Sequence, residues 1–173
     1  MARTGAMSLA TCACIVTVCG CVLGGCFTFR VGSGSFENVP SPIANPGDVT
    51  ALELSWDFAY LVGVGTYLPR DGDSPRYVCF GLDWGALIPQ GGIHPERQYL
   101  IAYTYVGHWY WAASPEEDGR ATGVRLGGRI PLHRGGDWDV ALEVSYDWKW
   151  LKDVSGSEDA RIDTVWLGVA LID

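Results

Sequence analysis

The stretch Trp138-Asp139-Val140-Ala141-Leu142-Glu143-Val144-Ser145-Tyr146-Asp147-Trp148-Lys149-Trp150 decides the fold of this chain. Large apolar residues occupy every second position, and charged or small residues occupy the positions between them. Successive side chains of a β-strand point to opposite faces, whereas an amphipathic helix repeats its apolar positions about every 3.6 residues. The alternation therefore predicts a long strand with one apolar face and one polar or small face.

The same period of two recurs along the rest of the chain. It predicts further strands at 52–68, 78–88, 99–111, 121–132 and 161–172, with 27–34 as a seventh. The connections are short and rich in turn residues, at 69–75, 89–96, 113–119, 133–136 and 153–159, and we expect the loops to be of similar length. Short turns of this kind join antiparallel neighbours as hairpins. Three prolines, Pro40, Pro42 and Pro46, place residues 37–48 in a loop.

The predicted fold is therefore an all-β antiparallel meander. We expect it to close into a small β-barrel of about eight strands that occupies residues 26–173 as a single domain. An even-numbered barrel needs one strand more than the seven that the pattern shows. A soluble lipocalin-like barrel or a β-sandwich is the alternative architecture.

Composition narrows the class of protein. The chain has 173 residues, a net charge of -8 and 48% apolar residues, so it is long enough for one domain and too apolar to be generally disordered. The excess of acidic residues argues against a nucleic-acid partner, because phosphates are met by clustered Lys and Arg. Residues 27–173 contain no apolar run of the length that a spanning helix needs.

Five of the six cysteines lie within the first 26 residues, in an uncharged segment (6–29) that follows Arg3. This pattern is typical of a secretory signal, and an uncleaved membrane helix is the alternative. The end of the segment, Leu23-Gly24-Gly25-Cys26, resembles the lipobox of bacterial lipoproteins. The resemblance implies that residues 1–25 are a cleaved signal peptide and that Cys26 becomes the lipidated first residue. An overlapping candidate, Val18-Cys19-Gly20-Cys21, leaves the cleavage site open.

The direction in which the apolar faces point distinguishes a soluble barrel from a membrane barrel. They point inward in a soluble barrel and toward lipid in a membrane barrel, whose polar face lines the lumen. Three features favour lipid. The runs are about 11 to 17 residues long, whereas soluble strands usually have about 5 to 6. The apolar faces carry no charge in the first five runs. They also carry fourteen aromatics, including Tyr99, Tyr103 and Tyr105, which a small barrel interior would not hold.

If the apolar faces meet lipid, two sets of residues acquire roles. The predicted polar network of the lumen comprises Glu53, Asp57, Asp83, Arg125, Arg129, Glu143 and Asp147, with Asp139 and Lys149 on the same face. The predicted lipid-facing aromatics are Trp56, Phe58, Trp84, Trp109, Trp111, Trp138, Trp148 and Trp150. The network is expected to be a salt-bridge plug more than a solute path, because eight-stranded barrels are usually filled by their own side chains.

From about residue 27 to residue 172 the chain resembles small outer-membrane β-barrel proteins of Gram-negative bacteria, in pattern and not in any motif. The resemblance implies location in the cell outer membrane, membrane lipid as partner, and a structural, surface-binding or weak solute-path role. The chain departs from that family at its end, Val169-Ala170-Leu171-Ile172-Asp173, which lacks a terminal aromatic. The alternative function is a periplasmic, lipid-anchored soluble barrel that binds an apolar ligand inside its aromatic face.

Catalytic signatures are weak. His94 and His133 lie in predicted loops, and His108 is a lone histidine on a strand, without the neighbouring ligands that a metal site requires. Ser55, Ser145 and His108 form no motif that would place a nucleophile beside a base. We therefore expect a protein that is not an enzyme and that uses neither a cofactor nor a metal.

Overall fold

The computed structural model describes residues 26–37, 47–57, 60–70, 74–87, 100–111, 119–135, 138–152 and 160–172. They form eight strands and one short helical turn. The strands are β1 (Cys26–Glu37), β2 (Gly47–Asp57), β3 (Tyr60–Pro69), β4 (Arg76–Asp83), β5 (Leu100–Trp111), β6 (Gly119–His133), β7 (Asp139–Lys152) and β8 (Arg161–Ile172). The helical turn, α2 (Trp84–Leu87), follows β4. No helix in these ranges is long and apolar enough to cross a membrane.

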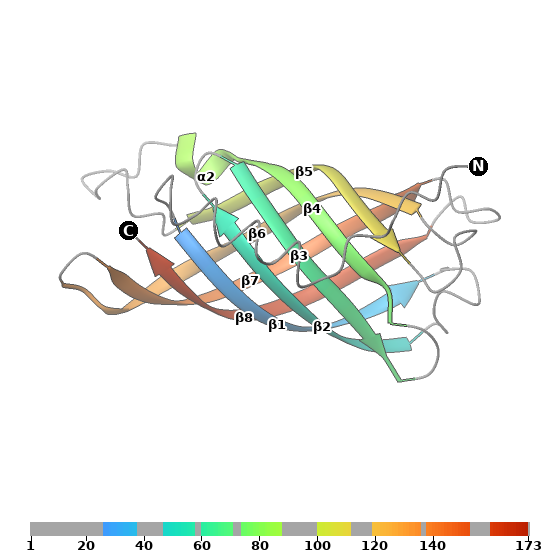
Figure 1. The fold of residues 1–173 in the computed structure, drawn as a ribbon, viewed down its shortest axis with the longest axis horizontal. Coiled ribbons are helices and arrows are strands. Elements are labelled where there is room, and N and C mark those ends of the chain that lie inside the picture. The colour runs from blue at the N-terminus through green and yellow to red at the C-terminus, as the bar shows by residue number, and fades with distance from the viewer. Residues whose placement is uncertain are drawn as a thin grey trace, which may run out of the picture.

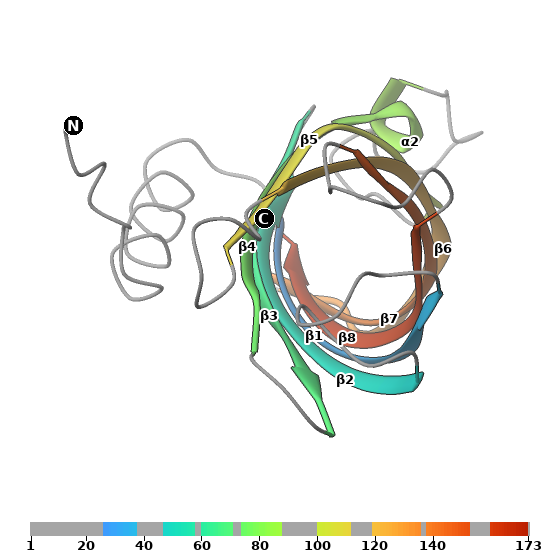
Figure 2. The ribbon, with the colours of Figure 1, turned by 90° about the vertical axis from the view of Figure 1, so that its right-hand side faces the viewer.

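The eight strands form a closed antiparallel barrel (Figures 1 and 2). Each strand pairs with the next one along the chain, and β1 pairs with β8 to close the ring. The prediction of a small eight-stranded barrel is thereby confirmed, and an open sandwich is excluded. Closure leaves no edge strand around the ring, so the strands are paired on both sides except near the rims, where β6, for example, continues past its last pair with β5 at Gly128.

The stagger of the strands sets the tilt and the width of the barrel. Following paired residues from Cys26 through each strand in turn leads back to β1 at Phe36, ten residues further along. In an eight-stranded barrel this stagger corresponds to strands inclined at about 40–45° to the barrel axis. Such a barrel is just wide enough for side chains to fill its interior.

The eighth strand was hidden in the predicted strand at 52–68. That run is two strands, because β2 ends at Asp57 and β3 begins at Tyr60. In the register between them Trp56 pairs with Val62 and Leu54 pairs with Val64. Directly paired residues point to the same face, so even-numbered residues face outward in both strands. The alternation of apolar and polar residues therefore continues through the connection without a break, so the alternation alone does not reveal that a turn is present.

The prediction for 99–111 was wrong in its faces. Tyr103 and Tyr105 were assigned to a lipid-facing side, but they and Ile101 lie inside the barrel and are at most 1% exposed. The pairing of β5 shifts register between Tyr105 and His108. Such a bulge adds a residue to one strand, so the two halves of the run do not share a face. The strand predicted at 78–88 also ends early, at Asp83.

The connections at the two rims differ, which corrects the expectation of similar lengths. The rim that holds Cys26 and Ile172, called here the terminal rim, joins β2 to β3 through two residues, whereas twelve residues separate α2 from β5. At the opposite rim, called the loop rim, the four connections have between six and nine residues. The barrel wall also ends at different heights, since β6 and β7 are the longest strands, with 15 and 14 residues.

Close packing of backbones makes one glycine a direct test of the fold. A Cβ atom at Gly123 would lie 2.0 Å from the carbonyl oxygen of Trp148 and 2.8 Å from the Cα of Lys149. We expect Gly123→Ala to lower the free energy of unfolding by about 1–3 kcal/mol through overpacking. Urea unfolding of the folded protein in detergent micelles measures this change. The neighbouring Thr122→Ala, on the outer face, should stay within about 0.5 kcal/mol of the parent. Equal stabilities of both variants would contradict this register.

Candidate functional site

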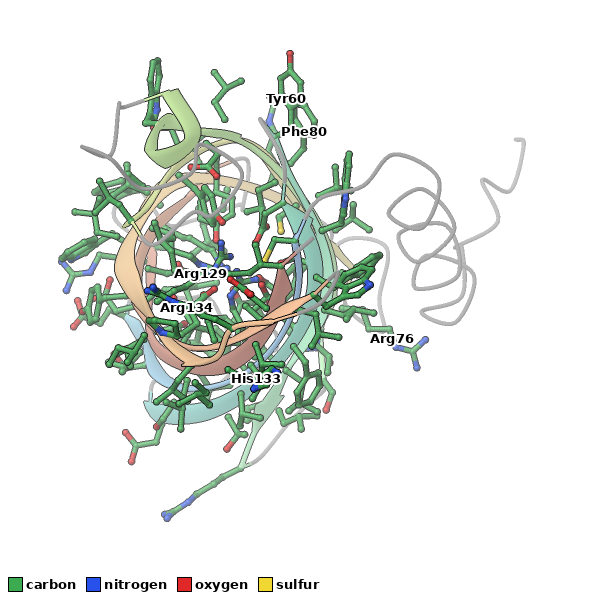
Figure 3. All side chains as sticks on the ribbon, turned by 90° about the vertical axis from the view of Figure 1, so that its left-hand side faces the viewer. Tyr60, Arg76, Phe80, Arg129, His133 and Arg134 are labelled. Atoms are coloured by element: carbon green, nitrogen blue, oxygen red, sulfur yellow. The ribbon has the colours of Figure 1, made fainter. Side chains whose placement is uncertain are left out.

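All seven residues predicted for the lumen network lie inside the barrel. Glu53, Asp57, Asp83, Arg125, Arg129, Glu143 and Asp147 are each at most 4% exposed. Four further charged side chains are buried with them: Arg30, Asp139, Lys149 and, at the outer wall near the loop rim, Asp163. Figure 3, viewed along the barrel, shows side chains filling the ring of strands, with Arg129 pointing inward.

Arg125 on β6 joins its neighbour on the adjacent strand β7, Asp147, to Glu53 on β2, across the barrel. Its guanidinium donates to both carboxylate oxygens of Glu53, at 2.6 and 3.0 Å, and to both oxygens of Asp147, at 2.5 and 2.9 Å. Its planar fork of donors matches a carboxylate in this two-bonded arrangement. Glu53 also accepts a hydrogen bond of 2.8 Å from the hydroxyl of Tyr77. A chain of charged groups thus crosses the interior from β2 to β7.

Arg30 on β1 extends this chain toward the terminal rim. It donates to Glu53 at 2.9 Å and to Asp57 at 3.3 Å, and it also contacts Glu143 and the hydroxyl of Ser55. Because Glu53 accepts from Arg30 and Arg125 together, one carboxylate links the two guanidinium groups. Arg30 therefore holds together residues from β1, β2 and β7.

Arg129 on β6 forms the end of the chain nearest the terminal rim. It donates to Asp57 at 2.6 Å and to Glu143 at 3.1 Å. The hydroxyls of Thr28 and Tyr103 lie at 3.2 and 3.4 Å from its Nη2 atom. Asp57 and Glu143 each contact both Arg30 and Arg129, so the chain continues without a break.

Lys149 on β7 forms the other end of the chain. Its Nζ atom lies 2.8 Å from Asp147 and donates to the hydroxyl of Tyr67 at 3.1 Å. The rings of Tyr67, Tyr77, Tyr105 and Trp166 surround the ammonium, with centroids 4.9–5.7 Å away. A cation over aromatic faces gains electrostatic energy that partly replaces its lost hydration. The indole of Trp166 in turn donates to Asp147 at 2.8 Å.

These eight groups, called here the charge ladder, are Arg30, Arg125, Arg129, Lys149, Glu53, Asp57, Glu143 and Asp147. Within the ladder the four cations and four carboxylates balance. Two further buried carboxylates, Asp83 from the predicted network and Asp139, lie at strand ends near the terminal rim and are not part of the ladder. Apolar side chains lie beyond both ends of the ladder. Cys26, Ala141, Ala170 and Ile172 cluster at the terminal rim, and Phe36, Val49, Leu151 and Ile162 pack toward the loop rim. The ladder is thus enclosed, and its donors and acceptors are used within the protein.

Sequence reasoning missed several members of this interior. Arg30 lies in 27–34, which was predicted as a strand without an assignment of its faces, although Phe29 and Val31 on either side of Arg30 show the alternation. Trp166 lies in β8, where both faces are apolar, so period alone did not place it. Tyr67 and Tyr77 fall on the small or polar face of their predicted runs but were not included in the network, whereas Tyr105 was placed on the wrong face. Their hydroxyls supply the signal that could have been used. A buried tyrosine needs a polar partner for its hydroxyl.

The outer wall carries the predicted lipid-facing aromatics where the structure describes them. Trp84, Trp138 and Trp150 are exposed, Trp148 is half-buried, and Trp56 packs against outward-facing Val64. Phe58 lies outside the described residues, as do the side chains of Trp109 and Trp111. The indole of Trp84 donates to the hydroxyl of Thr104 at 2.8 Å, so this outward N–H is satisfied within the protein.

Charge on the outer wall is confined to the rims. Near the loop rim the outward charged residues are Glu37, Asp48, Arg70, Arg76, Arg120, Arg161 and Asp163, and Arg134 lies beyond the terminal rim. Between them, no outward-facing residue of the described strands is charged. Along β6 this uncharged band runs from Thr122 to Leu132. At about 3.4 Å per residue and a tilt of about 40°, it is about 26 Å tall.

Cys26, the predicted lipidation site, lies in the inner wall. Its side chain is 4% exposed, and Sγ lies 3.5 Å from the hydroxyl of Thr28. The residue pairs with Asp57 on one side and Ile172 on the other. A lipid on Sγ has no room among these side chains, so lipidation requires residue 26 to turn out of its place in β1. Residues 1–25, the predicted signal peptide, lie outside the described residues, as does most of the predicted loop at 37–48.

The residues considered for catalysis do not come together. His133 is exposed near the terminal rim, Ser55 and Ser145 bond to charged groups of the ladder, and His94 and the side chain of His108 lie outside the described residues. Among the described residues, no three His, Cys, Asp or Glu side chains form a group suited to a metal ion. In comparisons with protein-family models, curated proteins and solved structures, nothing matches this chain.

The ladder makes a strong prediction about stability. Arg125→Met would leave Glu53 and Asp147 without their shared cation, so we expect a loss of about 3–5 kcal/mol in the free energy of unfolding. Adding Glu53→Gln should recover part of that loss, because one uncompensated carboxylate is removed. Urea unfolding in micelles measures both variants. The control Arg76→Met removes an exposed arginine and should change stability by about 0.5 kcal/mol or less. A loss no larger than the control's would contradict the ladder.

Cys79 tests whether the interior is closed. It is fully buried beside the ladder, with Sγ next to Gly63. We expect a small, water-soluble maleimide to leave Cys79 unmodified in the folded barrel and to modify it after unfolding in hot detergent. Mass spectrometry of the peptides identifies which cysteines react in the full chain. Rapid labelling of Cys79 in the folded protein would instead show that solutes enter the lumen.

Proposed function

We propose that this chain is a small integral outer-membrane β-barrel protein with a structural or surface-binding role. The observation that carries the proposal is the reversed distribution of polarity: a charge ladder inside the barrel and an uncharged apolar band outside. In a membrane barrel the outward face meets hydrocarbon and the inward face is polar, with an apolar band about 25 Å tall. The band along β6 has this height.

The amount of exposed apolar surface supports the same proposal. Sixteen large hydrophobic side chains on the outer wall are between 38% and 62% exposed, among them Phe29, Leu126, Leu167 and Val169. Soluble monomers rarely expose a continuous apolar patch larger than a few hundred Å². A band that surrounds the barrel calls for an apolar solvent, and bilayer hydrocarbon is one.

The enclosed interior favours a structural or surface-binding role over solute conduction. Each cation of the ladder contacts at least one carboxylate at 3.3 Å or less, and apolar side chains pack beyond both ends. A solute would have to break several buried ion pairs on its way through. The loops and the rims are therefore the surfaces through which the protein would contact other molecules.

The alternative function, a soluble barrel with an apolar ligand inside, loses its main support. That function required the aromatic face to line the interior, but Trp84, Trp138 and Trp150 face outward and the interior holds the ladder. We retain the signal peptide at residues 1–25 and a lipid at Cys26 as parts of the proposal. They would add a second attachment to the membrane, with residue 26 turned out of the inner wall.

A single charge on the outer wall distinguishes a membrane barrel from a soluble one. Leu167 lies at mid-wall on β8, pairs with Val31 and Val144, and is 56% exposed. In a bilayer, Leu167→Arg should cost about 2–4 kcal/mol and reduce insertion into lipid vesicles, whereas Leu68→Arg, near the loop rim, should cost about 0–1 kcal/mol. The inserted fraction is read from the faster migration of unheated barrel in SDS gels and from resistance to urea washing.

The same pair of variants can refute the proposal. In a soluble barrel Leu167 is a surface residue, so Leu167→Arg would change stability by about 0.5 kcal/mol or less. Protein that stays in solution without detergent, with both variants as stable as the parent, would rule out the membrane barrel.

A further inference from the structure

The β6–β7 hairpin reaches further along the barrel axis than the neighbouring strand ends (Figure 1). Pairing between β5 and β6 stops at Leu100 and Gly128 in the described residues, whereas β6 continues to His133, which pairs with Val140 of β7. Five residues of β6 thus extend past the last β5 pair. At about 3.4 Å per residue and a tilt of about 40–45°, they extend the wall by about 12 Å.

The outward side chains of this extension change in character from the wall to the tip. Ile130 and Leu132 come first, and they are the most exposed large hydrophobic residues of the described chain, at 59% and 62%. Trp138, on the returning strand, is 42% exposed. His133 and Arg134 are also exposed, and with Trp138 they form the tip, because the last pair of the hairpin is His133 with Val140. Apolar residues on the wall with aromatic and basic residues at the end are typical of segments that lie at a membrane–water interface.

The extension continues the uncharged band of the outer wall. Val124, Leu126, Ile130 and Leu132 lie on one face of β6 without an intervening charge. On the β5 side the described outward apolar residues end at Leu100, which pairs with Gly128, whereas on the other side Leu171 of β8 pairs with Val140 and so lies alongside the extension. The interfacial layer of a bilayer is about 5–8 Å thick on each side. On the β5 side, the projection of about 12 Å is longer than this layer is thick.

The edge of the extension is poorly suited to pairing with another strand. Pro131 has no N–H to donate, and the register shifts between Pro131 and His133. Proline and bulges at an edge both oppose the addition of a further strand. The tip is also held in place, since the N–H of Gly135 lies 3.3 Å from a carboxylate oxygen of Asp139, with φ of 154° at Gly135.

From these observations we infer that the end of the β6–β7 hairpin is a membrane-interface anchor. Leu132 lies where the hydrocarbon band meets the lipid headgroup layer at the terminal rim, Trp138 lies within that layer, and Arg134 reaches its aqueous edge. The inference rests on the proposed membrane barrel and adds to it a specific contact that fixes the depth of the barrel on one side. Its ligand is the lipid surface itself, not a second protein chain.

Depth-dependent quenching tests this inference in the full chain reconstituted in phosphatidylcholine vesicles. A polarity-sensitive thiol fluorophore is attached at Leu132→Cys, at mid-wall Leu167→Cys and at Glu37→Cys on the loop rim. Parent chain treated in the same way gives the background label, and unheated SDS mobility shows that each variant is folded. We expect lipids spin-labelled near the headgroup to quench the probe at 132 at least twofold more than lipids labelled deep in the acyl chain.

The control positions separate the possible failures. The probe at 167 should show the opposite preference, for deep spin labels, and the probe at 37 should be quenched mainly by aqueous iodide. If 167 responds to lipid but 132 responds to iodide alone, or to neither quencher, the hairpin lies in water or against protein and the anchor is refuted. If 167 itself fails to respond to lipid, the proposed membrane barrel is refuted together with the anchor.

Discussion

Buried charges must be paired, and the rest of this barrel is arranged around that requirement. An unpaired ion in a protein interior costs several kcal/mol, whereas a paired and hydrogen-bonded ion costs much less. Arg125 and Arg30 meet the requirement by sharing Glu53, and Arg30 and Arg129 do so by sharing Asp57 and Glu143. Because each carboxylate serves two cations, the ladder links six of the eight strands when its tyrosine partners on β3 and β4 are included.

The size of the ladder side chains also explains why some inward-facing positions of the strands are glycine. An eight-stranded barrel is only just wide enough for ordinary side chains, and this one holds three arginines, a lysine and Trp166. Gly65 makes room for Tyr77, whose hydroxyl would lie 2.4 Å from an added Cβ, and Tyr77 donates to Glu53. Gly32 makes the same room for Trp166. Small residues on the inward face and large residues on the outward face thus follow from one packing constraint.

That constraint also accounts for what could be predicted from the sequence. The inward set from Glu53 to Asp147 was identified because charge and bulk alternate with period two. The connection between β2 and β3 was missed because even-numbered residues face outward in both strands. The inner placement of Tyr103 and Tyr105 was missed because a bulge within β5 exchanges the inward and outward positions. The alternation of apolar and polar residues shows which side chains share a face. It does not reveal a turn across which the alternation continues, or a bulge that moves the apolar residues to the other face. Arg30 was missed because no faces were assigned to 27–34, although Phe29 and Val31 flank it with apolar side chains of the opposite face.

Cys26 is both the predicted lipidation site and a residue of the inner wall. These two roles are compatible only because of where Cys26 lies in the chain. Inside the barrel its Sγ contacts the hydroxyl of Thr28 and the carbonyl of Phe27, and its side chain packs in the cluster of Ala141, Ala170 and Ile172, so turning it outward would give up these contacts. In a chain cleaved before it, Cys26 would be the first residue, with no preceding backbone to hold its orientation. The ladder begins beyond it, at Arg30, and depends on none of its atoms. Attachment by lipid and insertion by the barrel wall are therefore physically separable, and either can be lost without the other.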